Sequence, residues 1–228
     1  MTRFTAGTAL LILCGVLVTT STAKADWSGG IEAGTQLGSG ENPALRFFAR
    51  HQGNPLSQYL YLDWIRESGS SSYRLGYNPT FNISQSIFSF GEFSLEQDDP
   101  GGVAREIDAR VGIGNHLFRT KNSRFTVHTG IGGTKVEFVD SENDTSEGFF
   151  FAGGLFTSKL IGLLRFDANI EATAGESQTT TRGEAGISFR IGPNTALKYA
   201  YSYRRFDFDT GQDDIVDEDS FLTVTYGF

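Results

Sequence analysis

The segment Ser220-Phe-Leu-Thr-Val-Thr-Tyr-Gly-Phe228 alternates apolar and polar side chains along its length. Leu222, Val224 and the last two aromatic residues share one face, and the two threonines share the other face with Gly227. Successive side chains of a β-strand point to opposite faces, so this pattern predicts a strand with one apolar and one polar face.

The same alternation recurs upstream in segments of about 9 to 13 residues, as expected of barrel-spanning strands. Clusters of Gly, Pro, Asn, Asp and Ser separate these segments and indicate turns. About twelve strands are predicted, an even number, as single-chain bacterial barrels require. The predicted strands are 27–37, 43–51, 58–67, 71–80, 86–96, 103–114, 123–138, 147–157, 163–173, 179–191, 195–206 and 219–228.

A water-soluble sandwich alternates in the same way, so the choice of fold depends on what the polar faces carry. Charges of both signs stand in mid-strand, as in residues 164–172 (LRFDANIEA). Inside a barrel such charges can pair within a polar lumen while the apolar face meets lipid. Aromatic residues make up 13% of the chain, and many lie near segment ends, which fits girdles at the two membrane surfaces. We therefore predict an all-β fold, a transmembrane antiparallel up-and-down β-barrel over residues 26–228.

Residues 1–25 have the features of a secretory signal peptide. Arg3 precedes an apolar run that is too short to span a membrane as a helix, and Ala23-Lys24-Ala25 forms a cleavage site. Cys14 follows Leu13, where lipoprotein processing requires a small residue, so a lipid anchor is disfavoured. After this segment, no apolar stretch approaches the roughly 18 to 20 residues that a membrane helix needs.

The predicted connections are of two kinds, which indicates how the barrel is oriented. If the N-terminus is periplasmic, the connections that face outward are GSGEN, ESGSS, EQDDPGG, VDSENDTSE, AGESQ and FDTGQDDIVDED, which are acidic and generally longer. The inward set, QGNPLS, NISQS, LFRTKN, SKLIG and GPN, is less acidic and mostly tighter. This asymmetry predicts a Gram-negative outer-membrane location with both termini in the periplasm.

The formal net charge of −8 argues against nucleic acid as a partner. The predicted partners are instead outer-membrane lipid, lipopolysaccharide and the barrel assembly machinery. Tyr226 and Phe228 form an aromatic chain end that resembles the sorting signal read by that machinery, so we expect both to act in assembly. No cofactor and no metal are predicted, and the oligomeric state stays open.

Charged side chains on the polar faces are the candidates for lining the lumen. Their signs are nearly balanced, so they can bridge the interior and leave it narrow or closed, whereas specific anion channels keep one sign in excess. The pattern favours a narrow pore or a structural barrel. The candidates are Arg46, Arg50, Asp63, Arg74, Glu92, Asp108, Arg110, Arg165, Asp167, Glu171, Arg182, Glu184 and Lys198, together with Glu106, Arg124 and Arg190 in the same registers.

The histidines raise the question of an enzyme. His51 and His116 lie at or beside strand ends, and His128 lies in mid-strand. Outer-membrane lipid-modifying enzymes use a histidine beside a serine nucleophile, because the imidazole must take the hydroxyl proton and a third group must orient it. His128 has no serine two residues away on the same face and no identifiable acidic partner. We interpret it as a polar lumen residue and predict no catalytic residue.

Two further motifs are weak. Residues 130–135 (GIGGTK) lack the spacing of a phosphate-binding loop and lie within a predicted strand. The acidic stretch 207–219 has a misplaced glycine and no flanking helices, which excludes an EF-hand. A solvated acidic loop is favoured, and carboxylates that hold divalent cations at the lipopolysaccharide surface are the alternative.

The stretch from about Ser72 to Val136, which includes YRLGYNPTFN and EIDARVGIG, resembles the salt-induced outer-membrane proteins, a family built on a domain of unknown function. The later TALKYAYSYRRFD and the terminal SFLTVTYGF are similar to the closing hairpin of that family. The resemblance implies an outer-membrane barrel of twelve strands without established catalytic residues.

Three functional hypotheses follow. The first is a non-enzymatic outer-membrane barrel, either a narrow solute channel or, as the resemblance implies, an envelope protein for osmotic stress. The alternatives are an outer-membrane lipid-modifying enzyme and a surface protein that binds a partner through its acidic outer loops. The sequence does not predict which solute would pass.

Overall fold

The computed structural model describes residues 27–37, 42–67, 70–98, 103–138, 145–176, 178–208 and 215–228. Residues 1–26 lie outside this set, and with them the predicted signal peptide. Among the described residues, no helix is long and apolar enough to cross a bilayer. The strands are β1 (Trp27–Leu37), β2 (Asn42–His51), β3 (Leu56–Glu67), β4 (Ser70–Asn82), β5 (Ile87–Asp98), β6 (Val103–Arg119), β7 (Ser123–Phe138), β8 (Thr145–Lys159), β9 (Leu164–Gly175), β10 (Gln178–Arg190), β11 (Thr195–Phe208) and β12 (Ile215–Gly227).

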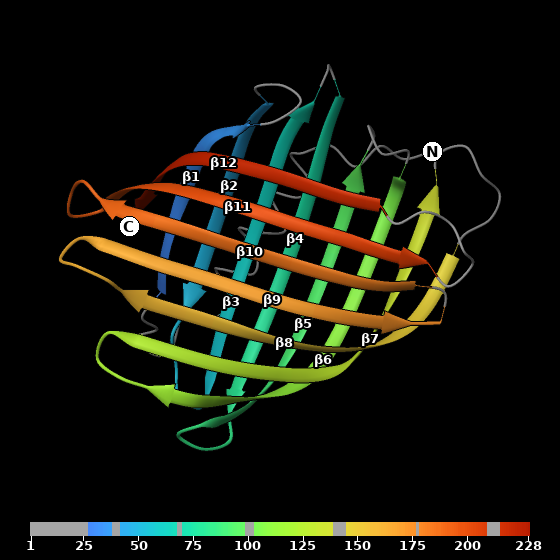
Figure 1. The fold of residues 1–228 in the computed structure, drawn as a ribbon, viewed down its shortest axis with the longest axis horizontal. Coiled ribbons are helices and arrows are strands. Elements are labelled where there is room, and N and C mark those ends of the chain that lie inside the picture. Colours follow the sequence, from blue (N-terminus) through green and yellow to red (C-terminus); the bar gives the residue numbers. More distant parts are fainter. Residues whose placement is uncertain are drawn as a thin grey trace.

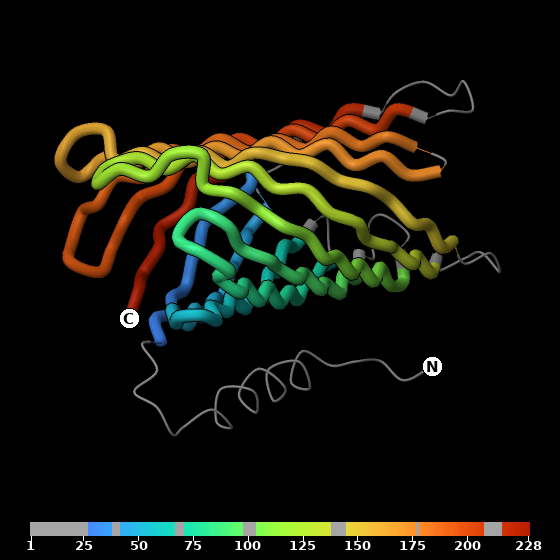
Figure 2. Tube along the Cα trace, turned by 90° about the horizontal axis from the view of Figure 1, so that it is seen from below, coloured from blue at the N-terminus to red at the C-terminus, as the bar shows by residue number. Residues whose placement is uncertain are grey.

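The twelve strands form one closed barrel in which every strand pairs antiparallel with its neighbours in sequence (Figure 1). β1 pairs with β12 to close it, and Ile31 lies opposite Tyr226 in that register. The C-terminal residue continues the closure, because the Phe228 amide donates to the Gly29 carbonyl at 2.8 Å and the Phe228 carbonyl accepts from the Gly29 amide at 3.0 Å. Figure 2 shows the end of the chain beside the start of β1. The predicted all-β antiparallel barrel is confirmed.

Two strands extend well past their predicted ends. β6 continues to Arg119 because Phe118 and Arg119 still pair with β7 beyond a register shift after His116. The predicted turn over 117–122 is therefore shorter in the structure and comprises residues 120–122. The Thr120 hydroxyl accepts hydrogen bonds from the amides of Asn122 and Ser123. β12 begins at Ile215 rather than at 219, so part of the predicted acidic loop is strand. Residues 207–208 end β11, and residues 209–214 lie outside the described residues.

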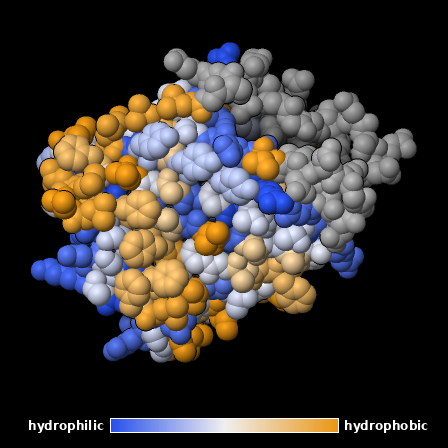
Figure 3. Space-filling model, in the orientation of Figure 1, coloured by the Kyte–Doolittle hydropathy of each residue, from blue (hydrophilic) through white to orange (hydrophobic). Residues whose placement is uncertain are grey.

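The two faces of the sheet differ as the alternation predicts. The outward face carries apolar side chains, among them Val111, Ile131, Phe150 and Ile170, whose exposed fractions run from 53% to 71%. Figure 3 shows apolar residues gathered on the part of this view that lies away from the grey atoms. No large described side chain is fully enclosed, so the barrel lacks the dry core of a soluble protein. An apolar surface this extensive requires lipid or another apolar cover.

Short turns join the strands at the end of the barrel where β1 begins and Phe228 lies. They comprise residues 52–55, 83–86, 120–122, 160–163 and 191–194. In one of them Gly162 adopts a φ of 52°, which is the left-handed region where a side chain is strained. The connections at the other end of the barrel include the residues after β1 that the structure does not describe: 38–41, 68–69, 99–102, 139–144, 177 and 209–214.

Candidate functional site

The inward face of the barrel carries the charged residues. Each lies on the face of its strand opposite the apolar one, and register partners on adjacent strands share that face. Arg46, for example, lies opposite Asp63, which lies opposite Arg74. The inward positions hold the predicted residues Arg46, Arg50, Asp63, Arg74, Glu92, Glu106, Asp108, Arg110, Arg124, Arg165, Asp167, Glu171, Arg182, Glu184, Arg190 and Lys198.

Adjacent strands contribute the first group of ion pairs. Arg46 on β2 forms a bidentate pair with Asp63 on β3, with nitrogen to oxygen distances of 2.5 and 2.8 Å. Its guanidinium also lies 5.7 Å from the ring centre of Tyr61. Bidentate arginine–carboxylate pairs have a fixed planar geometry, so Arg46 is held along the wall.

A second group centres on Arg110, which is only 6% exposed. Its guanidinium binds Asp108 at 2.7 and 3.2 Å and reaches Glu171 at 2.6 Å. The guanidinium also lies 5.3 Å from the ring of Phe149 and 5.8 Å from that of Phe151. Arg110 is on β6 and Glu171 is on β9, so this ion pair spans two intervening strands.

Glycines make this long contact geometrically accessible. Gly132 on β7 is the register partner of Arg110, and Gly153 on β8 is the register partner of Glu171. Neither position has a side chain, so the guanidinium and the carboxylate can extend toward each other along the wall.

The prediction that His128 has no acidic partner is wrong. Its Nε2 lies 3.2 Å from Oε2 of Glu171, whose other oxygen binds Arg110. The partner was missed because it lies 43 positions away in sequence, on a strand that does not pair with β7. Within the described ranges, no serine or threonine hydroxyl is hydrogen-bonded to His128, so this histidine and glutamate lack a nucleophile in contact.

The other histidines pack against rings at the turn end. His116 stacks on Phe88 with ring centres 5.0 Å apart, and its Nδ1 lies 2.9 Å from the Thr126 hydroxyl. His51 lies beside Trp27, with ring centres 5.3 Å apart.

Aromatic residues also line the interior, which the prediction of girdles at strand ends did not include. Several of these rings occupy the space that a side chain on an inward-facing glycine of the adjacent strand would need, so that a Cβ on Gly76 would overlap Tyr61. The inward aromatic residues include Phe48, Tyr59, Tyr61, Phe88, Phe90, Phe149 and Phe151.

A third group differs because its arginines form no ion pair with any described carboxylate. Arg182 on β10 lies opposite Arg204 on β11. Among the described residues, neither forms a hydrogen bond or an ion pair, and the Nε atom of each is buried without a partner. The Arg204 guanidinium lies 4.4 Å from the ring centre of Phe206.

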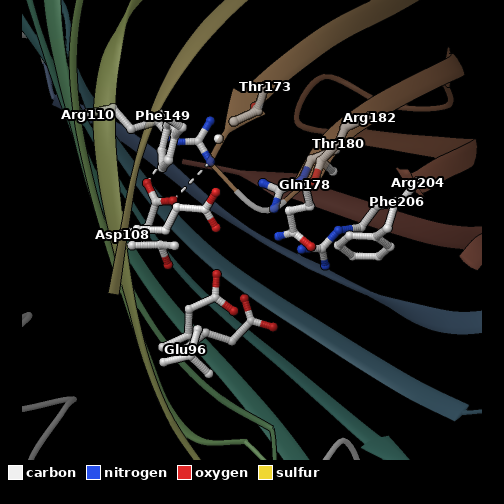
Figure 4. Close-up of a pocket in the computed structure, with 15 residues that line it drawn as sticks. Glu96, Asp108, Arg110, Phe149, Thr173, Gln178, Thr180, Arg182, Arg204 and Phe206 are labelled. Carbon is white, nitrogen blue, oxygen red and sulfur yellow. Dashed lines mark hydrogen bonds and ion pairs between the residues drawn. The ribbon is translucent and has the colours of Figure 1, made fainter. Parts of the chain in front are cut away.

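These two arginines border a cavity of about 290 Å³, which we call the lumen cavity. Glu96 and Glu106, register partners on β5 and β6, border it as well. Figure 4 shows Glu96 and Asp108 on one side and Arg182 and Arg204 on the other. Opposite charges therefore stand on facing walls of this cavity.

The list of candidates drawn from the sequence omitted several inward charges. Arg204 continues the alternation of Lys198, and Glu96 was assigned to the start of a loop. Glu32 accepts a hydrogen bond from Thr223 at 2.6 Å and lies 3.7 Å from the Lys198 amine. The period of two along β1, β5 and β11 is the signal that would have included all three residues.

The ion pairs of the described interior run along the wall. They join residues of one strand, of adjacent strands, or, for Arg110, His128 and Lys198, of strands farther round the same wall. In the described ranges, no group of three or more His, Cys, Asp or Glu side chains is placed to hold a metal ion.

A closed barrel of twelve antiparallel strands, apolar outside and charged inside, defines a β-barrel of the outer-membrane porin type. The chain belongs to the family described as "Protein of unknown function, DUF481", which matches residues 44–228. No curated protein matches the sequence.

Solved structures share the fold. The NanC porin is similar with a TM-score of 0.59 at 11% identity, over 87% of this chain and 98% of that one. The KdgM porin is similar with a TM-score of 0.56 at 10% identity, over 88% and 99% of the two chains. A second KdgM structure, in complex with disordered oligogalacturonate, has a TM-score of 0.54 at 11% identity over the same shares.

Proposed function

We propose that this protein is a non-enzymatic outer-membrane channel that passes small hydrophilic solutes through its charged lumen. The observation that carries the proposal is the direction of the interior ion pairs. Because they run along the wall, they hold long side chains against the sheet and do not tie opposite walls together. A structural barrel with a packed interior would instead pair its charges across the bore.

The cavities of the interior support the same proposal. The lumen cavity adjoins a second one of about 410 Å³, which shares Glu96, Glu106, Arg182 and Arg204 with it. Toward the middle of the barrel, a smaller cavity of about 120 Å³ lies among Arg46, Asp63, Glu184 and Lys198. The cavity toward the middle of the barrel is smaller than the other two, so we expect a narrow channel for small solutes.

The apolar exterior and the sequences at both ends of the chain support an outer-membrane location. The apolar face requires lipid, and the outer membrane is where single-chain barrels of this kind reside. We propose that residues 1–25 direct export, that Tyr226 and Phe228 direct assembly, and that both termini are periplasmic. A role in osmotic stress is supported only by the resemblance to salt-induced proteins.

Proteoliposome swelling tests the channel. Liposomes that contain the protein should swell in arabinose and glucose and should swell more slowly in the larger sucrose, because the lumen is narrow. Swelling no faster than that of protein-free liposomes, in every sugar, would contradict the proposal.

Two adjacent residues provide a matched control. Ala200 faces the lumen and is 4% exposed, whereas Tyr199 faces outward and is 47% exposed. Ala200→Trp should obstruct the lumen and lower the swelling rate, and Tyr199→Trp should leave it unchanged. Equal rates for the two variants would show that solutes do not pass through the barrel interior.

A further inference from the structure

We propose that Arg182 and Arg204 form a binding site for the carboxylate of a small solute, in the lumen cavity. This inference rests on the proposed channel function and assigns it a solute class. The two residues lie directly opposite each other on β10 and β11, where a pair of like charges destabilises a sheet unless something compensates it.

Both guanidiniums have unused hydrogen-bonding capacity. The Nε atoms are shielded from solvent and have no partner among the described residues. A buried donor on a charged group that makes no hydrogen bond is unfavourable, and a bound anion would remove that penalty. The planar fork of an arginine matches the two oxygens of a carboxylate, so two adjacent forks can hold one carboxylate between them.

The expected counter-ion of Arg182 is held elsewhere. Glu171 is its register partner on β9, yet both Glu171 oxygens are engaged, one by Arg110 and the other by His128. Asp217 is the register partner of Arg204 on β12, but it forms no ion pair with that guanidinium. Contacts outside the site therefore engage the register partner of Arg182, and Arg204 forms no ion pair with its own register partner.

The rest of the cavity restricts what can bind. Thr180 and Gln178 place polar groups beside the arginines, while Glu96 and Glu106 stand on the facing wall. These two carboxylates repel a highly charged anion and accept hydrogen bonds from hydroxyl groups. The favoured solute therefore carries one carboxylate and several hydroxyls, as a sugar acid or a hydroxy acid does.

Isothermal titration of the folded barrel in detergent tests the site, with glucuronate and glucose as probes. The two sugars differ chiefly in the carboxylate. We expect glucuronate to bind the unmodified protein and glucose to bind at least about tenfold more weakly, as the loss of a charge-assisted contact predicts. The variant R182Q/R204Q should bind glucuronate about 100-fold more weakly, because two such contacts are lost.

Two further variants separate the site from general effects. Arg165 also faces the lumen, but it is paired with Asp167 at 2.7 Å, so R165Q should bind glucuronate as the unmodified protein does. R182K/R204K keeps the charge and loses the planar forks, so its affinity for glucuronate should lie between that of the unmodified protein and that of R182Q/R204Q. Heat-dependent gel mobility and circular dichroism would verify that each variant is a folded barrel.

The outcomes distinguish the site from the channel. The site is overturned if the unmodified protein binds glucuronate no better than glucose, or if R182Q/R204Q binds it as tightly as R165Q. Sugar swelling by R182Q/R204Q liposomes would still support the channel in either case. Binding without any swelling in the unmodified protein would support the site and overturn the channel.

Discussion

The carboxylate of Glu171 on β9 lies 2.6 Å from the guanidinium of Arg110 on β6, although Arg182 is its partner in the adjacent strand. This contact fastens two charged side chains along the wall across the glycines of β7 and β8. It also engages the carboxylate that is the register partner of Arg182. Among the described residues, one ion pair thus contributes both to the alignment of charges along the wall and to the lack of an ion pair at Arg182.

Replacing Arg110 should destabilise the barrel. Arg110→Gln leaves Asp108, which is 5% exposed, and Glu171 without their common cation. Removing one partner of a buried ion pair lowers the free energy of unfolding by about 3 kcal/mol. Urea unfolding in lipid vesicles, followed by tryptophan fluorescence, would measure the change. Arg165→Gln removes a more exposed ion pair and should lower the free energy of unfolding by about 1 kcal/mol or less. An equal decrease for both variants would refute the special role of Arg110.

The same replacement should also weaken carboxylate binding, although Arg110 is not one of the two proposed binding arginines. In Arg110→Gln, Glu171 loses its strongest partner and can turn to Arg182, its register neighbour. Glucuronate affinity should then fall by about tenfold, since one charge-assisted contact is blocked. The double variant R110Q/E171Q removes the competing carboxylate and should recover most of the affinity. Failure of the double variant to bind better than R110Q would rule out this competition.

The outward face can be tested with adjacent residues on β9. Ile170 is 60% exposed on the apolar face, whereas Asn169 borders an interior cavity. An arginine on the lipid face near the middle of the membrane lowers the free energy of unfolding by about 2 to 4 kcal/mol. Ile170→Arg should therefore destabilise the protein in vesicles far more than Asn169→Arg does. The reverse order would mean that the two faces have been assigned wrongly.

Deletion of Phe228 should impair assembly. The residue makes two backbone hydrogen bonds with Gly29 that extend the pairing of β1 and β12, and it is 73% exposed at the rim. We expect the amount of folded protein in outer-membrane fractions to fall sharply. Phe228→Tyr keeps the backbone contacts and an aromatic ring, so its yield should stay near that of the unmodified protein. A normal yield after deletion would remove the proposed assembly signal.

Strand identity was predictable because the period of two extends through nearly every strand. The contacts that define the site were not, because they join residues on strands that do not pair. Arg110 and Glu171 are 61 positions apart, and only the barrel register brings β6 and β9 to one wall. The turn after β6 was predicted to begin at residue 117, yet pairing with β7 continues through Arg119. The interior phenylalanines were missed because their place depends on glycines of adjacent strands.

Single-channel recording in planar lipid bilayers tests the open lumen most directly. We expect the purified protein to produce discrete, reproducible current steps, and we expect Ala200→Trp to reduce their size while Tyr199→Trp leaves it unchanged. Folded, inserted protein that gives no current steps at any applied voltage would contradict the proposal that the lumen is a solute path.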